Sequence, residues 1–385
     1  MHHFLNDLPD LVSKIKALKD LIITNIVLVG QIPSPTFEEK RRVDFFMDRL
    51  AEFLVDECTL DAYGNPIGII RGTSKELPPI FLVAHLDTAF KGPADYYYTV
   101  NQDSITGPGL IDNSVSVGVL LSLPILFERL GLKPASDIVL AGVIQSIGKG
   151  NLLGIRHLLK TWPTSIRGGI CLEGVELGRL NYYTEAMNRM EIFCRIPEGP
   201  ERKRNHFPNA VVVLNETINA ILHIRLPQRP HSQIVLGKIS GGHKHGESAQ
   251  EARLGLEIRS DSDEMVRELR NDIRDLTASI AERYKVDLKV KTISDIHGAG
   301  LAYNHPLVKS TVDVMKRLNL TPIRDPSESE LSIFLSGNIP AVTLGLTRGE
   351  NYHMENARIE IEPLFTGIAQ VLGVLAAIDS GVCDG

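Results

Sequence analysis

Histidine and carboxylate side chains stand where several apolar stretches of this 385-residue chain end. His85 and Asp87 directly follow the apolar run 80–84. A carboxylate two residues beyond a metal-binding histidine can hold the second ring nitrogen and fix its tautomer. Most isolated His-x-Asp pairs are solvated surface residues, so a metal site needs further ligands from elsewhere in the chain.

Three other segments supply candidate ligands. Asp112 lies in the glycine-containing stretch GPGLIDN, just before an expected helix, where a carboxylate can bridge two cations or simply cap the helix. Glu173 follows an apolar strand, and His353 lies in a loop after another. Together with His85 these residues are expected at one edge of a sheet, and a set of histidines and carboxylates suits zinc.

The elements that must position these residues alternate between apolar strands and amphipathic helices. This order predicts an α/β domain with a mainly parallel sheet. Strands are expected at 80–84, 138–141 and 341–344, each apolar enough to be buried on both faces. A helix is expected from about 36 to 55, because Thr36 and Glu39 have the spacing of a capping box.

The middle third of the chain has a different order of elements. The expected strands and helices alternate as β-α-β-β-α-β, which is the ferredoxin-like arrangement, at 187–195, 208–224, 233–239, 250–259, 261–284 and 286–294. Asp261, Ser262 and Asp263 are candidate caps for the second helix. The prediction is a catalytic α/β domain formed by residues 1–185 and 298–385, with an inserted lid and dimerisation domain at 186–297.

The motifs, in this order along nearly the whole chain, resemble those of the aminoacylase, carboxypeptidase G and peptidase T family of zinc peptidases and deacylases. The resemblance implies that His85 and Glu173 bind one zinc ion, that His353 binds the other, and that Asp112 bridges them. It also implies that Asp87 orients His85 and that the peptide bond after Asp112 is cis. The implied substrates are small peptides or N-acyl amino acids, and the implied assembly is a homodimer formed through the inserted domain.

The chain departs from the family at the catalytic pair of glutamates, a general base followed by a metal ligand. The segment GKGNLLGIR aligns Ser146 with the base and Ile147 with the ligand, and no Asp or Glu occurs between Asp137 and Glu173. A serine hydroxyl has too high a pKa to act as a base near neutral pH, and an apolar side chain binds no cation. One zinc ion is therefore expected rather than two, or no metal at all.

Two classes of function follow from this departure. The first is a hydrolase of peptide or N-acyl amide bonds with impaired or altered catalysis, which uses one metal ion or another base. The nearest candidate bases in sequence are Glu176, Glu185 and Glu355. The second is a non-catalytic relative that binds a ligand or regulates. In the inserted domain, the resemblance implies substrate contacts by Arg259 and, less strongly, by His206, for which a solvated loop position is the favoured alternative.

Composition excludes several other classes. A formal charge of -6, from 41 basic and 47 acidic residues, gives no basic excess for nucleic-acid binding. The four cysteines are scattered, which favours a reduced, cytoplasmic setting. No apolar run is expected to approach the roughly 20 residues of a membrane span, and no signal peptide is expected at the N-terminus.

Overall fold

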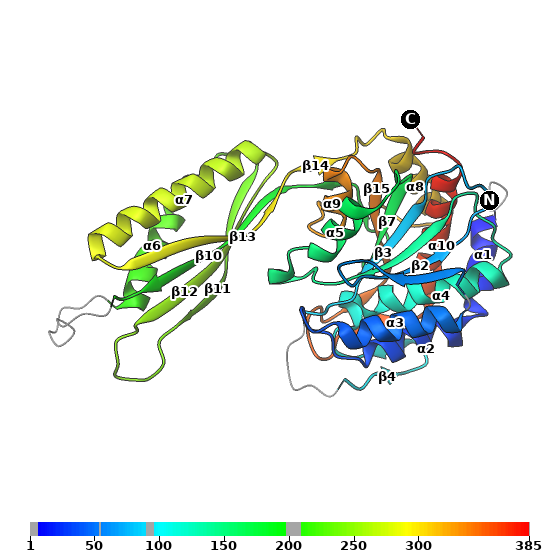
Figure 1. Ribbon diagram of the computed structural model, residues 1–385, viewed down its shortest axis with the longest axis horizontal. Coiled ribbons are helices and arrows are strands. Elements are labelled where there is room, and N and C mark those ends of the chain that lie inside the picture. The colour runs from blue at the N-terminus through cyan, green and yellow to red at the C-terminus, as the bar shows by residue number, and fades with distance from the viewer. Residues whose placement is uncertain (1–6, 54, 90–95, 198–208, 385) are drawn as a thin grey trace. The chain divides into compact units, whose positions relative to one another are not determined.

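The chain folds into two compact units (Figure 1). The structure is a computed structural model that describes residues 7–53, 55–89, 96–197 and 209–384. Unit 1 consists of Met1–Thr184 and Gly300–Gly385, and unit 2 consists of Glu185–Ala299. The predicted division, after residues 185 and 297, lies close to both of these boundaries.

A seven-stranded sheet forms the centre of unit 1. Its strands, in spatial order, are β1 (Glu57–Leu60), β2 (Pro66–Ile70), β6 (Ile138–Val143), β3 (Ile80–His85), β7 (Gly168–Val175), β15 (Ala341–Thr347) and β8 (Leu180–Asn181). The four central strands, β6 to β15, run parallel, whereas the outer strands pair antiparallel. The three buried strands predicted from their apolar runs are confirmed as β3, β6 and β15.

Helices cover both faces of this sheet. They are α1 (Leu8–Lys16), α2 (Lys19–Gly30), α3 (Lys40–Glu52), α4 (Val115–Arg129), α5 (Leu153–Thr161), α8 (Pro306–Arg317), α9 (Leu331–Ser336) and α10 (Glu362–Asp379). Ile80 and Leu82 of β3 belong to the same apolar core as α2, α4 and α10. Phe81 points to the other face, where its ring lies 4.8 Å from that of Trp162 and 6.4 Å from that of Phe334, at α5 and α9.

Two helical segments are more apolar than was expected from the sequence. Residues 110–129 and 362–379 are each long and apolar enough to cross a membrane, so the expectation that no such run exists is wrong. Within the protein, however, 94% and 83% of their apolar windows are buried. Such burial is typical of core helices, and here both helices pack against the central sheet.

The start of α3 differs from the prediction. The helix begins at Lys40, and Thr36 and Glu39 do not form a capping box. The Thr36 hydroxyl instead donates to the Asp87 carboxylate over 2.9 Å, and the Glu39 carboxylate accepts the backbone N–H of Gln145 over 2.9 Å. Glu39 also accepts the nearby backbone N–H of Phe37 over 3.0 Å, but both side chains have a tertiary partner and so tie this segment to the loops that follow β3 and β6.

Unit 2 contains the predicted elements in the predicted β-α-β-β-α-β order. They are β10 (Ala186–Arg195), α6 (Ala210–Leu222), β11 (Ser232–Gly241), β12 (Glu251–Ser260), α7 (Asp263–Tyr284) and β13 (Asp287–Ile296). The strands form one antiparallel sheet in the order β11-β12-β10-β13, with its own apolar core. Of the three candidate caps, Ser262 caps α7, and its hydroxyl accepts the backbone N–H of Met265.

A buried arginine joins α3 to two segments at the carboxyl edge of the sheet. Arg42 has no exposed surface, and burial lowers the pKa of its guanidinium. It donates to the backbone oxygens of Ile32 (2.8 Å) and Leu86 (3.0 Å) and to the hydroxyl of Ser114 (3.0 Å). Leu86 lies between His85 and Asp87, so this arginine fixes the segment that carries the first site motif.

Replacing Arg42 with methionine should destabilise the protein by about 3 to 5 kcal/mol, because buried oxygens lose their donors while most of the side-chain volume is kept. Chemical denaturation followed by circular dichroism would measure the change. Arg41→Met is a matched control, since Arg41 is exposed one position earlier. Equal stability of the two variants would contradict the role of Arg42.

Candidate metal centre

Three of the predicted ligands meet at the carboxyl edge of the central sheet. His85 is the last residue of β3, and Glu173 lies on β7, opposite Gly345 of the parallel strand β15. Asp112 lies in the helical turn Leu110–Ser114 that precedes α4. The ligand atoms of His85, Asp112 and Glu173 all lie within 4.8 Å of one another, which is close enough to hold one metal ion.

The Asp112 carboxylate lies between two imidazole rings. One oxygen is 3.0 Å from Nε2 of His85, and the other is 2.9 Å from Nε2 of His353. Asp112 does not cap α4, so the simpler role considered for it is wrong. The Asp112–Asn113 peptide bond is cis, as the resemblance implied. The structure thus brings all four predicted ligands together, and their binding of metal remains a prediction.

A small sheet carries His353 to this position. Its strands are β16 (Gly349–Glu350), β17 (Arg358–Glu360), β5 (Ser104–Thr106) and β4 (Thr99–Val100). His353 lies between β16 and β17 with φ of 62°, in the left-handed region, and 53% of its side chain is exposed. A cavity of about 10 Å³ beside Asp112 and His353 has room for little more than one water-sized group.

Asp87 is fully buried and supports His85 in two ways. The Nδ1 atom of His85 is 2.9 Å from the main-chain oxygen of Asp87 but 3.5 Å from its carboxylate, so the closer contact is with the backbone. The predicted support by the carboxylate is therefore secondary. The carboxylate mainly accepts N–H groups of Ser146 (3.2 Å) and Ile147 (2.8 Å), which ties the loop after β6 to the site.

Proton affinities in the site are strongly perturbed. Burial lowers the pKa of His85, but hydrogen bonds with Asp112 and Asp87 outweigh it and leave that pKa well above its ordinary value. Burial raises the pKa of Asp112, but its bonds with His353 and His85 prevail and hold that pKa below normal. Burial, aided by the charges of Asp112 and Glu330 and opposed by His85, raises the pKa of Glu173 to about 7.

A carboxylate lies beside Ser146, the residue that stands where the family resemblance requires a glutamate. Ser146 lies in the loop after β6, and its hydroxyl donates to the carboxylate of Glu330 over 2.5 Å. Glu330 is 3% exposed and immediately precedes α9, at a sequence distance of 184 residues from Ser146. Sequence reasoning missed this residue. The available signal was weak, namely an acidic residue directly before the short apolar stretch LSIFL.

The three bases proposed from sequence proximity differ in burial and in the unit to which they belong, and their role as a base remains a prediction. Glu176 and Glu355 are exposed. Glu185 belongs to unit 2, where it lies with His231 and Asp261 in a second group of possible ligand atoms, of which the His231 and Asp261 side chains are exposed. Closeness to the site motifs along the chain therefore did not identify the carboxylate that reaches Ser146.

Two predicted substrate contacts belong to the inserted unit. Arg259 lies on β12, is 33% exposed, and has a guanidinium nitrogen 3.6 Å from a carboxylate oxygen of Glu257. His206 lies outside the described residues. The substrate-binding roles of Arg259 and His206 therefore remain predictions.

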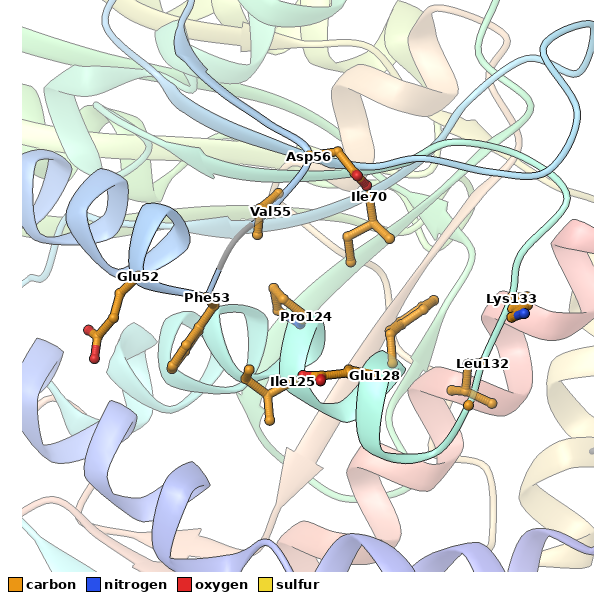
Figure 2. Close-up of a pocket in the computed structure, with 12 residues that line it drawn as sticks. Glu52, Phe53, Val55, Asp56, Ile70, Pro124, Ile125, Glu128, Leu132 and Lys133 are labelled. Carbon is orange, nitrogen blue, oxygen red and sulfur yellow. The ribbon is translucent and has the colours of Figure 1, made fainter.

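A larger cavity lies at the opposite edge of the central sheet (Figure 2). Its volume is about 560 Å³, and the ends of α3 and α4 line it together with Ile70. Ile70 pairs with Ile138, the first residue of β6, whereas His85 is the last residue of the parallel strand β3. The predicted metal ligands therefore stand at the other end of the strands from this cavity.

No family model and no curated protein sequence matches the chain. Its fold is nevertheless that of known peptidase structures. The dipeptidase Dug1p from Saccharomyces cerevisiae superposes with a TM-score of 0.79 at 11% identity, covering 97% of this chain and 99% of that one. Aminopeptidase PepT from Bacillus cereus superposes with a TM-score of 0.70 at 15% identity, covering 94% of this chain and 98% of that one. YXEP from Bacillus subtilis is described as a dinuclear metal-binding peptidase of the M20 family. It superposes with a TM-score of 0.65 at 14% identity, covering 94% of this chain and 98% of that one.

The affinity for zinc should rise with pH between about 6 and 8. Zinc needs neutral His85 and ionised Glu173, but the metal-free site favours the protonated form of both, with the pKa of Glu173 at about 7. At a pH below the pKa of a ligand, zinc must displace a proton from that ligand. For each such ligand, the zinc affinity should fall about tenfold for each unit by which the pH is lowered. Competition titrations with a chromophoric chelator at several pH values would measure this, and a pH-independent affinity would contradict it.

Proposed function

We propose that this protein is a metal-dependent hydrolase of peptide or N-acyl amide bonds with impaired or altered catalysis. The observation that carries the proposal is the convergence of His85, Asp112 and Glu173 within 4.8 Å at the carboxyl edge of the sheet. The second imidazole, that of His353, stands 2.9 Å from Asp112. The fold shared with M20 peptidases, across more than nine tenths of the chain, supports the same reaction class.

The donor set suits a single zinc ion. One imidazole nitrogen and two carboxylates provide three ligands and leave a fourth position open, as in catalytic zinc sites. When bound there, zinc would polarise the scissile carbonyl group and make a water molecule more acidic. A second ion would have only Asp112 and His353, since Ile147 replaces the remaining expected ligand. We therefore expect one ion per chain.

The altered catalysis follows from the loop after β6. Ser146 and Ile147 stand where the family resemblance requires a basic glutamate and a liganding glutamate. Unit 2 is proposed to act as a ferredoxin-like lid that contributes Arg259 and His206 to substrate binding. The proposed substrates are small peptides or N-acyl amino acids, and the proposed location is the cytoplasm, consistent with four free cysteines.

The second candidate is a non-catalytic ligand-binding or regulatory protein, and the apolar side chain of Ile147 at a ligand position favours it. In that case the site would keep a cleft for a ligand but would not turn it over. Metal content and activity distinguish the two candidates.

Elemental analysis of protein purified without chelators should give about one zinc per chain, as expected for three ligands. The zinc-loaded protein should hydrolyse some members of a panel of dipeptides and N-acetyl amino acids. Ile147→Glu should raise the zinc content towards two, whereas Ile147→Leu, the matched control, should not. A content of two in the unmodified chain would contradict the predicted loss of a ligand. No metal and no turnover would favour the non-catalytic candidate.

We further propose that unit 2 forms a homodimer. Its strand β11 is an edge strand that is largely exposed, and α6 exposes large apolar side chains. The exposed fractions are 53% for Val212 and 62% for Leu222 on α6, and 64% for Ile239 on β11. Exposed apolar groups on an edge strand and the neighbouring helix suit pairing with a second copy.

Lysine at both Val212 and Ile239 should convert the dimer into a monomer, because two charges would be desolvated in each half of the interface. Light scattering coupled to size-exclusion chromatography would measure the mass. Leu28→Lys, at an exposed apolar position of unit 1, is the control and should leave the mass unchanged. An unmodified protein that is already monomeric at micromolar concentration would contradict the dimer.

A further inference from the structure

Glu330 is a buried carboxylate whose surroundings do not explain it as a structural group. Its side chain is 3% exposed and does not cap α9, although it is the residue at the start of that helix. Among the described residues, the hydrogen bond assigned to its side chain comes from Ser146, a neutral hydroxyl. Burying a carboxylate without a cationic partner is costly, and such groups are concentrated at functional sites.

The carboxylate lies within electrostatic reach of the candidate metal centre. Its negative charge raises the pKa of both His85 and Glu173. Ser146, the hydrogen-bonded partner of Glu330, is also linked to the ligands. Its backbone N–H donates to the Asp87 carboxylate, and the main-chain oxygen of Asp87 contacts Nδ1 of His85. Glu330, Ser146 and the ligand cluster therefore form one connected group.

The hydrogen bond also has a direction that matters for chemistry. The Ser146 hydroxyl uses its hydrogen to reach Glu330, so its lone pairs remain available to accept a hydrogen from elsewhere. A serine alone is too weak a base near neutral pH. A serine that passes its own proton to a carboxylate at 2.5 Å is not limited in this way, since the carboxylate is the final acceptor.

We infer that Ser146 and Glu330 together replace the missing general base, with Glu330 as the final proton acceptor. This inference depends on the proposed hydrolase function. As the oxygen of the hydrolytic water bonds to the amide carbon, its proton passes to the Ser146 oxygen and the serine proton passes to Glu330. When the carbon–nitrogen bond breaks, the proton returns by the same route to the leaving amine. Glu330 is then again a carboxylate.

Glu330→Gln tests the inference in the zinc-loaded full-length protein. Glutamine keeps the size and an oxygen that can accept the Ser146 hydrogen bond, but it cannot take up the proton. The expected result is a fall in kcat of about a hundredfold to ten-thousandfold, the usual contribution of a general base, with KM little changed. Zinc affinity measured by calorimetry should change far less than kcat, since Glu330 acts on the ligands only through its charge. The melting temperature should not fall, because the substitution removes a buried charge.

Three further variants complete the experiment. Glu328→Gln is the matched control, an exposed glutamate two residues earlier, and should keep full activity. Ser146→Ala should lose as much kcat as Glu330→Gln, and it tests the relay if the glutamine variant does not fold. In the double variant Ser146→Glu with Glu330→Gln, the carboxylate returns to position 146, so much of the lost rate should be recovered.

The outcomes separate the inference from the function on which it depends. Full activity of Glu330→Gln or of Ser146→Ala, in a protein that hydrolyses its substrate, would overturn the relay and leave the hydrolase proposal standing. A parallel loss of zinc affinity and kcat would show a structural or metal-binding role and would also overturn it. No turnover by the unmodified zinc-loaded protein would overturn the hydrolase proposal, and the inference with it.

Discussion

The placement of the Asp112 carboxylate, which is only 11% exposed, between two imidazoles is the constraint on which the carboxyl edge of unit 1 depends. A carboxylate removed from water must find positive or hydrogen-bonding partners, and Asp112 has Nε2 atoms of His85 and His353 at 3.0 and 2.9 Å. These partners come from β3 and from the loop between β16 and β17, which lie far apart in sequence. The sheet and the small accessory sheet must both be correctly formed before the three side chains can meet.

A second layer of buried polar contacts keeps these segments in place. Arg42 donates to the main-chain oxygen of Leu86, beside His85, and to the hydroxyl of Ser114, the last residue of the turn containing Asp112. The Asp87 carboxylate accepts hydrogen bonds from the Thr36 hydroxyl and from two backbone N–H groups in the loop after β6. Because each of these groups is buried, each would be costly to leave unpaired, and the network therefore specifies one arrangement of the four segments. Arg42 and Asp87, which are not predicted ligands, thus hold the segments that carry the ligands in place.

Sequence patterns predicted the parts of this architecture that depend on local periodicity. The apolar runs gave β3, β6 and β15, and the order of elements in unit 2 was correct, because strands and helices differ in the spacing of their apolar residues. The meeting of His85 and Glu173 could be predicted because parallel strands end at a common edge, which Asp112 and His353 reach from a turn and from a loop. Thr36 shows the limit of local patterns, since its capping spacing was real but a buried carboxylate competed for the hydroxyl.

Glu330 could not be predicted in this way, because no local pattern connects α9 to the loop after β6. Only the packing of the fold brings its carboxylate to Ser146. The absence of acidic residues between positions 137 and 173 was a correct observation, but it did not imply an absence of carboxylates in space. A missing catalytic residue in one segment can thus be replaced by a group from a distant one.

The position of β15 in the central sheet has a consequence for biosynthesis. This strand lies between β7 and β8, yet it begins only at Ala341, after the whole of unit 2 has been made. Unit 2 is continuous in sequence and has its own core, so it can fold on the ribosome as soon as it emerges. Unit 1, by contrast, cannot complete its central sheet until Ala341–Thr347 has been synthesised, because that strand pairs with β7.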